Sequence, residues 1–181
     1  MIAAAILTGG RARRLLGRDK SRLVTGPDGR TILERQIDLL APLVSEILIV
    51  TSARRLPDFA ALATDAAGGR PPVRVVADRD PDAGPLAAVV TALQETRSPA
   101  LFVLAGDMPD VTAEFIRELA AAHAQGRHDV TAPQSSRGLE PLAALYGASA
   151  RPSLESALAS GERSLQRALR ALQLALVPAA D

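Results

Sequence analysis

The sequence contains no cysteine, which excludes disulfide bonds, thiolate catalysis and cysteine-ligated zinc sites. It contains only two histidines, His123 and His128, so we expect no histidine-rich metal site and predict structural or solvent-exposed roles for both. Aromatic residues make up only 2% of the chain, so the core must consist of aliphatic residues and alanine. The apolar run at residues 2–8 is too short to span a bilayer and lacks the flanks of a signal peptide. We therefore expect a cytoplasmic protein without a membrane partner.

The formal net charge is only +1, which argues against a general nucleic-acid-binding protein. Positive charge is instead concentrated in one segment, where a single acid, Asp19, is surrounded by basic residues. Lys20 is the only lysine of the chain, which indicates a site where a compact ammonium fits and a planar guanidinium does not. The basic residues of this segment are Arg11, Arg13, Arg14, Arg18, Lys20 and Arg22.

This basic segment follows an apolar run and a Gly9-Gly10 turn, a combination that directs backbone N–H groups and positive charge at phosphates. A P-loop is excluded because Gly17 is followed by Arg18 rather than lysine, and no G-x-G-x-x-G fingerprint is present. What remains is the pattern L-x-G-G-x-x-x-R-x-x-G-x-D-K at residues 7–20. The alternative is an ordinary strand–turn–helix connection with a solvated basic face.

Apolar runs alternate with helical patterns, which predicts a single α/β domain over residues 1–181 with a mostly parallel sheet and an antiparallel strand. The apolar runs are continuous, as expected for strands covered by helices on both faces, in a three-layer α/β/α Rossmann-like fold. The predicted strands are residues 2–8, 47–52, 73–77, 100–105, 129–132, 142–146 and 174–178. The predicted helices are residues 31–40 with a Thr31/Glu34 capping box, 58–67, one starting at Pro85, one capped by Thr112 and ended by Gly126, 153–159 and 164–172.

Three loops that follow predicted strands carry polar groups, at residues 8–22, 78–84 and 106–110. In doubly wound sheets, ligands bind beyond the carboxyl ends of the strands, so we expect these loops to form one site. Asp107 directly follows the apolar strand 100–105, and a carboxylate held there can bind Mg²⁺ together with phosphate oxygens. The alternative for an aspartate in such a turn is a side chain that caps nearby N–H groups, a role better suited to Asp110.

The loop motif resembles the signature loop of nucleotidyltransferases with a glycosyltransferase-A-like fold, and within them the molybdenum cofactor guanylyltransferases. Other segments share this resemblance, which covers residues 2–172. They are Gly106-Asp107-Met108-Pro109, Asp78 followed by Gly84-Pro85-Leu86, the E-P-L-A-A-L-Y run at 140–146, and Gly161-Glu162-Arg163-Ser164-Leu165.

The resemblance implies that the protein transfers GMP from GTP to the phosphate of a molybdopterin-type acceptor, releasing pyrophosphate, with Mg²⁺ as cofactor. It implies that Asp107 binds the metal, that Lys20 stabilises charge on the transferred phosphate, and that Arg14 stabilises the outgoing pyrophosphate. The residues implied to bind the nucleotide are Leu7, Thr8, Gly9, Gly10, Lys20, Asp78 and Asp107.

The sequence departs from the family pattern at two places. Ala53-Arg54 stands where the family carries an Asn-Arg pair, so we expect a narrower preference for GTP over CTP. An Asn-Thr-Pro-like segment, which usually follows the last strand, is not found before Asp181. The alternative functions are therefore a cytidylyltransferase acting on the same or another phosphorylated acceptor, and a catalytically silent nucleotide-binding relative. The sequence does not specify an oligomeric state, and a monomer is compatible with it.

Overall fold

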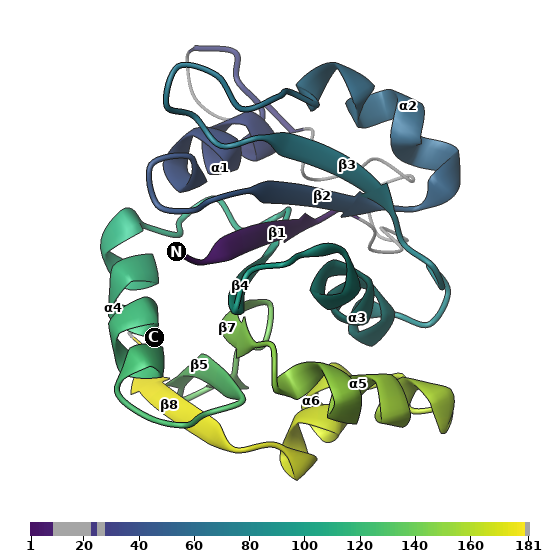
Figure 1. The fold of residues 1–181 in the computed structure, drawn as a ribbon, viewed down its shortest axis with the longest axis vertical. Coiled ribbons are helices and arrows are strands. Elements are labelled where there is room, and N and C mark those ends of the chain that lie inside the picture. Colours follow the sequence, from purple (N-terminus) through teal and green to yellow (C-terminus); the bar gives the residue numbers. More distant parts are fainter. Residues whose placement is uncertain (9–22, 25–27, 180–181) are drawn as a thin grey trace.

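The computed structural model describes residues 1–8, 23–24 and 28–179, which form a central β-sheet with helices on both faces (Figure 1). This arrangement confirms the predicted three-layer α/β/α class with a mostly parallel sheet. The strands are β1 (Ala3–Leu7), β2 (Ile47–Thr51), β3 (Val73–Ala77), β4 (Ala100–Ala105), β5 (Val130–Ser135), β6 (Gly138–Leu139), β7 (Ala143–Gly147) and β8 (Leu174–Pro178).

The sheet is built outward from β1, which pairs in parallel with β2 on one side and β4 on the other. β3 pairs in parallel with β2, while β7 pairs antiparallel with β4. β5 is antiparallel to β7 and parallel to β8, so β5 runs in the same direction as β4. The carboxyl ends of β1 to β5 therefore lie at one edge of the sheet, which we call the carboxyl edge.

Two groups of helices cover the two faces of the sheet (Figure 1). The first group, α1, α2 and α4, packs on one face; the second, α3, α5 and α6, packs on the other. The helices are α1 (Ile32–Leu40), η2 (Ala53–Arg55), α2 (Leu56–Phe59), η3 (Ala60–Leu62), α3 (Pro85–Glu95), α4 (Ala113–Ala124), α5 (Ala150–Ala159), α6 (Leu165–Ala168) and η4 (Leu169–Ala171), where η marks a 3-10 helix.

β1 shows why its apolar run is continuous. Ala3 and Ala5 belong to the core on the α3 side, whereas Ala4 and Ile6 belong to the core on the α1 side. All four side chains are fully buried because successive strand residues point to opposite faces and both faces are covered.

Local sequence signals fix the starts of three helices as predicted. Thr31 Oγ1 accepts the N–H of Glu34, and the Thr31 N–H donates to Glu34 Oε2, which completes the capping box of α1. Pro85 occupies the first turn of α3, where its missing N–H removes no helical hydrogen bond. Thr112 Oγ1 accepts the N–H of Phe115 and begins α4, which ends at Ala124, just before Gly126.

The predicted helix at residues 58–67 is helical only as far as Leu62, and the prediction is wrong for residues 63–67. Helical structure starts earlier, at Ala53, and stops at Leu62. Beyond it, the Thr64 N–H donates to Val73 O at 3.0 Å and the Val73 N–H donates to Thr64 O at 2.9 Å. This bridge places the chain against β3, so these residues are extended rather than helical. The predicted helix at 153–159 also starts earlier, at Ala150, and the short strand β6 was not predicted.

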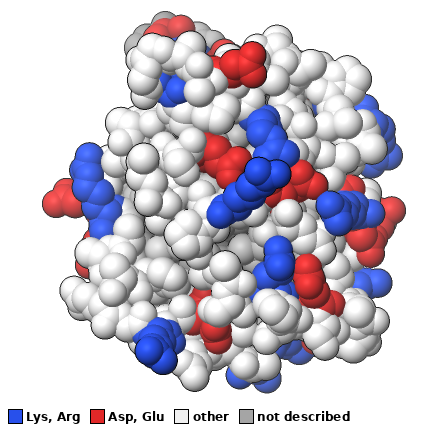
Figure 2. All heavy atoms as spheres, in the orientation of Figure 1, with Lys and Arg blue, Asp and Glu red and all other residues white. Residues whose placement is uncertain are grey.

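The surface of the described residues carries charges of both signs. On the face drawn in Figure 2, basic and acidic side chains lie next to one another and form no continuous basic patch. This mixed distribution agrees with the low net charge of the chain. Among the helices of the described ranges, none has the length and apolar character needed to cross a membrane.

Candidate functional site

The carboxyl edge brings together the ends of four neighbouring parallel strands. Leu7 pairs with Val50 of β2 and with Ala105 of β4, and Thr51 pairs with Ala77 of β3. This register places the strand ends side by side, and the first residues beyond them form a row of Asp78, Ser52, Thr8 and Gly106. Leu7, Thr8, Asp78 and Asp107, all predicted site residues, lie along this row, whereas Gly9, Gly10, Arg14 and Lys20 lie outside the described residues.

Thr8 is fixed where β1 ends and the signature segment begins. It is buried, and both its N–H (2.9 Å) and its hydroxyl (3.1 Å) donate to Val50 O. Its carbonyl accepts Arg55 Nη1 at 3.0 Å. The Arg55 guanidinium lies 5.2 Å from the centre of the Phe59 ring and 3.4 Å from the Asp58 carboxylate. The chain therefore enters residues 9–22 from a rigid position.

Asp107 lies in a tight turn directly after β4. The Gly106 N–H donates to Leu7 O at 2.9 Å, which ties the turn to the end of β1. The Met108 N–H donates to Ala105 O at 3.2 Å and closes the turn. The side chain of Asp107 is exposed at this edge. The structure thus places Asp107 beside the residue from which the signature segment starts, and its role as a metal ligand stays a prediction.

Gln36 of α1 hydrogen-bonds to the backbone of this turn from the core. Its Nε2 donates to both Ala105 O and Met108 O, each at 2.9 Å, and the side chain is buried. The two carbonyls bracket Gly106-Asp107. Sequence analysis did not identify Gln36, although a signal was available: it lies three residues after Leu33 on the apolar stripe of its helix.

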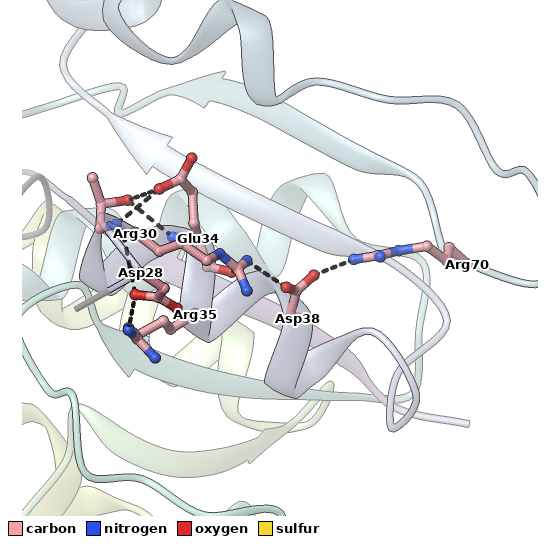
Figure 3. Close-up of polar contacts among 7 residues, drawn as sticks. Asp28, Arg30, Glu34, Arg35, Asp38 and Arg70 are labelled. Carbon is pink, nitrogen blue, oxygen red and sulfur yellow. Dashed lines mark hydrogen bonds and ion pairs between the residues drawn. The ribbon is translucent and has the colours of Figure 1, made fainter. Parts of the chain in front are cut away.

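α1 itself is anchored by ion pairs on its outer side (Figure 3). Arg70, which precedes β3, donates to Asp38 at 2.5 Å, and Arg30 pairs with the other oxygen of the same carboxylate. The hydrogen bonds from Arg70 and Arg30 hold the pKa of Asp38 below its usual range. Asp28 pairs with Arg35, so the chain just before α1 is also tied to it. Each of these exposed pairs contributes little to stability, but they connect α1 to the chain before it and to the segment before β3.

Asp78 occupies the β3 end of the row. Its N–H donates to Thr51 O at 2.6 Å, and its Oδ1 accepts the Asp80 N–H at 3.1 Å and the Thr91 hydroxyl at 3.4 Å. Burial raises the pKa of the carboxyl group, and these hydrogen bonds offset the rise only in part. Thr91 of α3 is a contact that the sequence pattern did not reveal.

The two carboxylates lie on strands that are separated by β2 and β1. With about 4.8 Å between neighbouring strands, the three intervals place the ends of β3 and β4 about 14 Å apart. Metal–oxygen bonds are about 2 Å long, so Asp78 and Asp107 cannot bind one Mg²⁺ together. Asp78 and Asp107 therefore lie toward opposite ends of the row.

A divalent metal fits the Asp107 end of the row. Within the described ranges, no group of three or more His, Cys, Asp or Glu side chains could hold an ion without other ligands. A single exposed carboxylate on a rigid turn suits Mg²⁺, which takes one or two protein carboxylates and completes its shell with phosphate oxygens and water. The residues present therefore fit a metal that binds together with a nucleotide.

The two histidines lie away from this row. His123, near the end of α4, hydrogen-bonds through Nδ1 to Thr131 Oγ1 at 2.9 Å, and burial lowers its pKa. It packs against Gly147, which pairs with Ala100 at the start of β4, so it lies at the opposite edge from Asp107. By contrast, the hairpin around Ser135 lies at the carboxyl edge, because β5 is parallel to β4.

Comparison with known proteins gives one consistent relationship. A family described as "MobA-like NTP transferase domain" matches residues 4–176. A protein of Chloroflexus aggregans described as "Probable molybdenum cofactor guanylyltransferase" is 38% identical over 175 residues, covering 95% of this chain and 78% of that protein. A "Molybdenum cofactor guanylyltransferase" of Shewanella amazonensis is 32% identical over 181 residues, covering 99% of this chain and 86% of that protein.

Solved structures agree in fold. A molybdopterin-guanine dinucleotide biosynthesis protein A from Archaeoglobus fulgidus superposes with a TM-score of 0.78 at 24% identity, covering 98% of this chain and 83% of that one. A 4-diphosphocytidyl-2C-methyl-D-erythritol synthase from Anaerococcus prevotii gives a TM-score of 0.71 at 15% identity, covering 98% and 86%. At these identities the structural matches establish the fold alone.

Proposed function

The chain belongs to the MobA-like NTP transferase family, and we propose that this nucleotidyltransferase transfers GMP from GTP to the terminal phosphate of molybdopterin. The reaction releases pyrophosphate and depends on Mg²⁺. Guanine is supported as the base by relatives of 38% and 32% identity that are described as guanylyltransferases.

The observation that carries the proposal is the row of groups along the carboxyl edge. Asp78 lies at one end, the turn of Asp107 lies at the other, and the end of β1 lies between them. A nucleoside triphosphate that lies across this edge has its base near Asp78 and its phosphates near Asp107. The backbone of Leu7 and Thr8 then borders the middle of the nucleotide.

The chemistry needs little covalent participation by the protein. An oxygen of the acceptor phosphate attacks the α-phosphorus of GTP, and the new P–O bond replaces the bond to the β-phosphate. The electron pair of the broken bond leaves with pyrophosphate. An ionised phosphate nucleophile has no proton to lose, so no general base is required. Positioning and neutralisation of charge are therefore the main tasks of the protein.

We assign these tasks to few residues. Lys20 stabilises negative charge on the transferred phosphate, and Arg14 stabilises the outgoing pyrophosphate; both lie in the signature segment. Asp107 would hold Mg²⁺, which when bound neutralises charge on the phosphates. Asp78 binds the nucleotide at its base end through a carboxylate that the Thr91 hydroxyl and the Asp80 N–H orient.

A cytidylyltransferase remains the second candidate because of Ala53. Ala53 is exposed at the start of η2, beside the row, and its methyl side chain offers no hydrogen bond to a base. The neighbouring Arg55 directs its guanidinium to Thr8 O. A missing amide removes one source of discrimination between guanine and cytosine.

The test is to incubate the purified protein and Mg²⁺ with molybdopterin and GTP, CTP or ATP, and to measure pyrophosphate release and product mass. We expect GTP to react fastest and to form the guanine dinucleotide. Reaction with CTP alone would establish the cytidylyltransferase. Tight binding of GTP without pyrophosphate release would identify a silent relative, and the absence of any nucleotide binding would refute all three.

A further inference from the structure

Gln36 is buried in the core beneath the carboxyl edge, yet its carboxamide contacts the backbone of the Asp107 turn rather than another side chain. Its Nε2 donates to Ala105 O and to Met108 O, each at 2.9 Å. An amide nitrogen carries two protons, so both are used. The two acceptors are the last carbonyl of β4 and the carbonyl just beyond Asp107, which means that one side chain spans the turn.

The oxygen of the same carboxamide differs from the nitrogen in its contacts. Gln36 Oε1 is buried and has no hydrogen-bond partner among the residues that the structure describes. A buried oxygen without a partner is unfavourable, and an apolar side chain of the same length would avoid that cost. The two N–H donors are therefore the feature that distinguishes glutamine from methionine at this position.

The location of these donors is set by α1 and not by the side chain alone. Leu33, Ile37 and Leu40 pack the helix into the core around Gln36. On the outer side, Asp38 is paired with both Arg30 and Arg70 (Figure 3). Gln36 thus contacts the turn from a helix that is held on two sides.

We propose that Gln36 is a positioning residue for Asp107: its two hydrogen bonds fix the turn so that the carboxylate is oriented to bind a divalent cation together with the nucleotide phosphates. The inference rests on the proposed function. Residues that orient a metal ligand typically change metal affinity by about 10- to 100-fold when they are replaced.

The test replaces Gln36 with methionine, which keeps length and volume but removes both donors. Gln94→Met is the matched control, because Gln94 is a glutamine on α3 whose Nε2 donates to Glu155 Oε1 at 2.8 Å, away from the turn. Two quantities are measured on the full chain. One is the affinity of the protein for Mn²⁺ in the presence of GTP, and the other is the rate of hydrogen exchange at the amides of residues 106–108. Thermal melting and GTP affinity without metal are recorded alongside.

For Gln36→Met we expect about tenfold weaker Mn²⁺ binding and faster exchange at residues 106–108, with metal-free GTP affinity unchanged. Gln94→Met should match the wild type in all three. If Gln36→Met does not fold, Gln36→Leu also removes both donors without adding a charge and is measured in its place, with the same expected changes.

Wild-type Mn²⁺ affinity and wild-type exchange in a Gln36 variant would overturn the inference, even if the melting temperature falls, because the contact would then be structural only. If the wild-type protein binds GTP without any metal dependence, the metal site and the role of Gln36 both fail. If the wild type shows metal-dependent binding and the Gln36 variants do not differ from it, only the inference fails and the proposed function stands.

Discussion

Asp78→Asn tests whether the base end of the row binds the nucleotide. The substitution preserves the shape of the side chain, and an asparagine Oδ1 can accept the same Asp80 N–H and Thr91 hydroxyl. Burial raises the pKa of Asp78, which means that the folded protein is less stable with this carboxyl group ionised than with it neutral. We therefore expect the variant to melt at or slightly above the wild-type temperature at neutral pH.

Nucleotide binding should respond differently from stability. A hydrogen bond to a charged acceptor contributes about 1.5–3 kcal/mol, against about 0.5–1.5 kcal/mol for a neutral one. Replacing a carboxylate that accepts from the nucleotide therefore costs about 1–2 kcal/mol, or roughly 5- to 30-fold in the Kd for GTP. Asp80→Asn is the control, because Asp80 is exposed and the variant keeps both the Asp78 carboxylate and the N–H that it accepts; losing the Asp80 charge should only lower the raised pKa of Asp78.

The raised pKa also predicts how binding depends on pH. As pH falls toward that raised pKa, Asp78 takes up a proton and its carboxylate is lost, so GTP affinity should fall in the wild type. The asparagine variant should lack this dependence. The sign for stability is the opposite: the folded state holds the proton more tightly than the unfolded state, so protonation of Asp78 stabilises the fold as pH falls through the raised pKa.

Isothermal calorimetry of GTP binding to both proteins, from about pH 7.5 down to about pH 4, covers the ordinary pKa of an aspartate and the range above it, and measures the affinity and its pH dependence. His123 lies at the opposite edge and titrates equally in the two proteins, so the difference between them reports Asp78. An Asp78→Asn protein that binds GTP within twofold of the wild type, with the same pH profile, would refute the reasoning. Asp78 would then only order the chain between β3 and α3, through the Asp80 N–H and the Thr91 hydroxyl.

Four further outcomes are expected. Asp107→Asn should lower Mg²⁺-dependent transfer at least about 100-fold with little change in melting, and transfer within about tenfold of the wild type would exclude Asp107 as an essential ligand. Lys20→Arg should be as slow as Lys20→Ala in single-turnover assays if the site requires a compact ammonium. Ala53→Asn should increase the preference for GTP over CTP by about fivefold in competition assays, that is by about 1 kcal/mol. Asp129→Asn should reduce the unfolding free energy by roughly 0.5–1 kcal/mol in neutral urea titrations, a small effect because solvent screens this largely exposed carboxylate. Hydrogen bonds, the largest from Ser149, lower the pKa of Asp129, so this difference should vanish as pH falls through that lowered pKa.

Much of the fold follows from local sequence patterns. The strand at residues 100–105 was predicted with its observed bounds, because six consecutive apolar residues between turn residues have few alternatives. The Thr31/Glu34 capping box likewise specifies the start of α1 through contacts three residues apart. Such features depend on neighbours in sequence, and a pattern can therefore reveal them.

The failures have a different origin. Residues 58–67 were predicted as a helix, but Thr64 pairs with Val73, which the local pattern around Thr64 does not contain. Gln36 and Arg55 were not identified because their partners are distant in sequence: Met108 lies 72 residues from Gln36, and Thr8 lies 47 residues from Arg55. The position of Asp78 and Asp107 at one edge of the sheet was predictable, because each follows a strand and parallel strands bring their carboxyl ends to one edge.

The contacts of Arg55 and Gln36, which the sequence did not predict, have a common effect on the site. Arg55 fixes the carbonyl of Thr8, where the chain enters the signature segment, and Gln36 fixes the turn of Asp107 on the neighbouring strand. Both act on backbone atoms, so they set where functional groups lie without contributing those groups. Asp78 is held separately, from the α3 side of the sheet through Thr91. Because the ends of β3 and β4 are about 14 Å apart, and different helices support Asp78 and the turn of Asp107, the contributions of the two residues should be nearly independent. A change in base preference near Ala53 and Asp78 can therefore arise while the geometry for phosphate transfer at Asp107 stays intact.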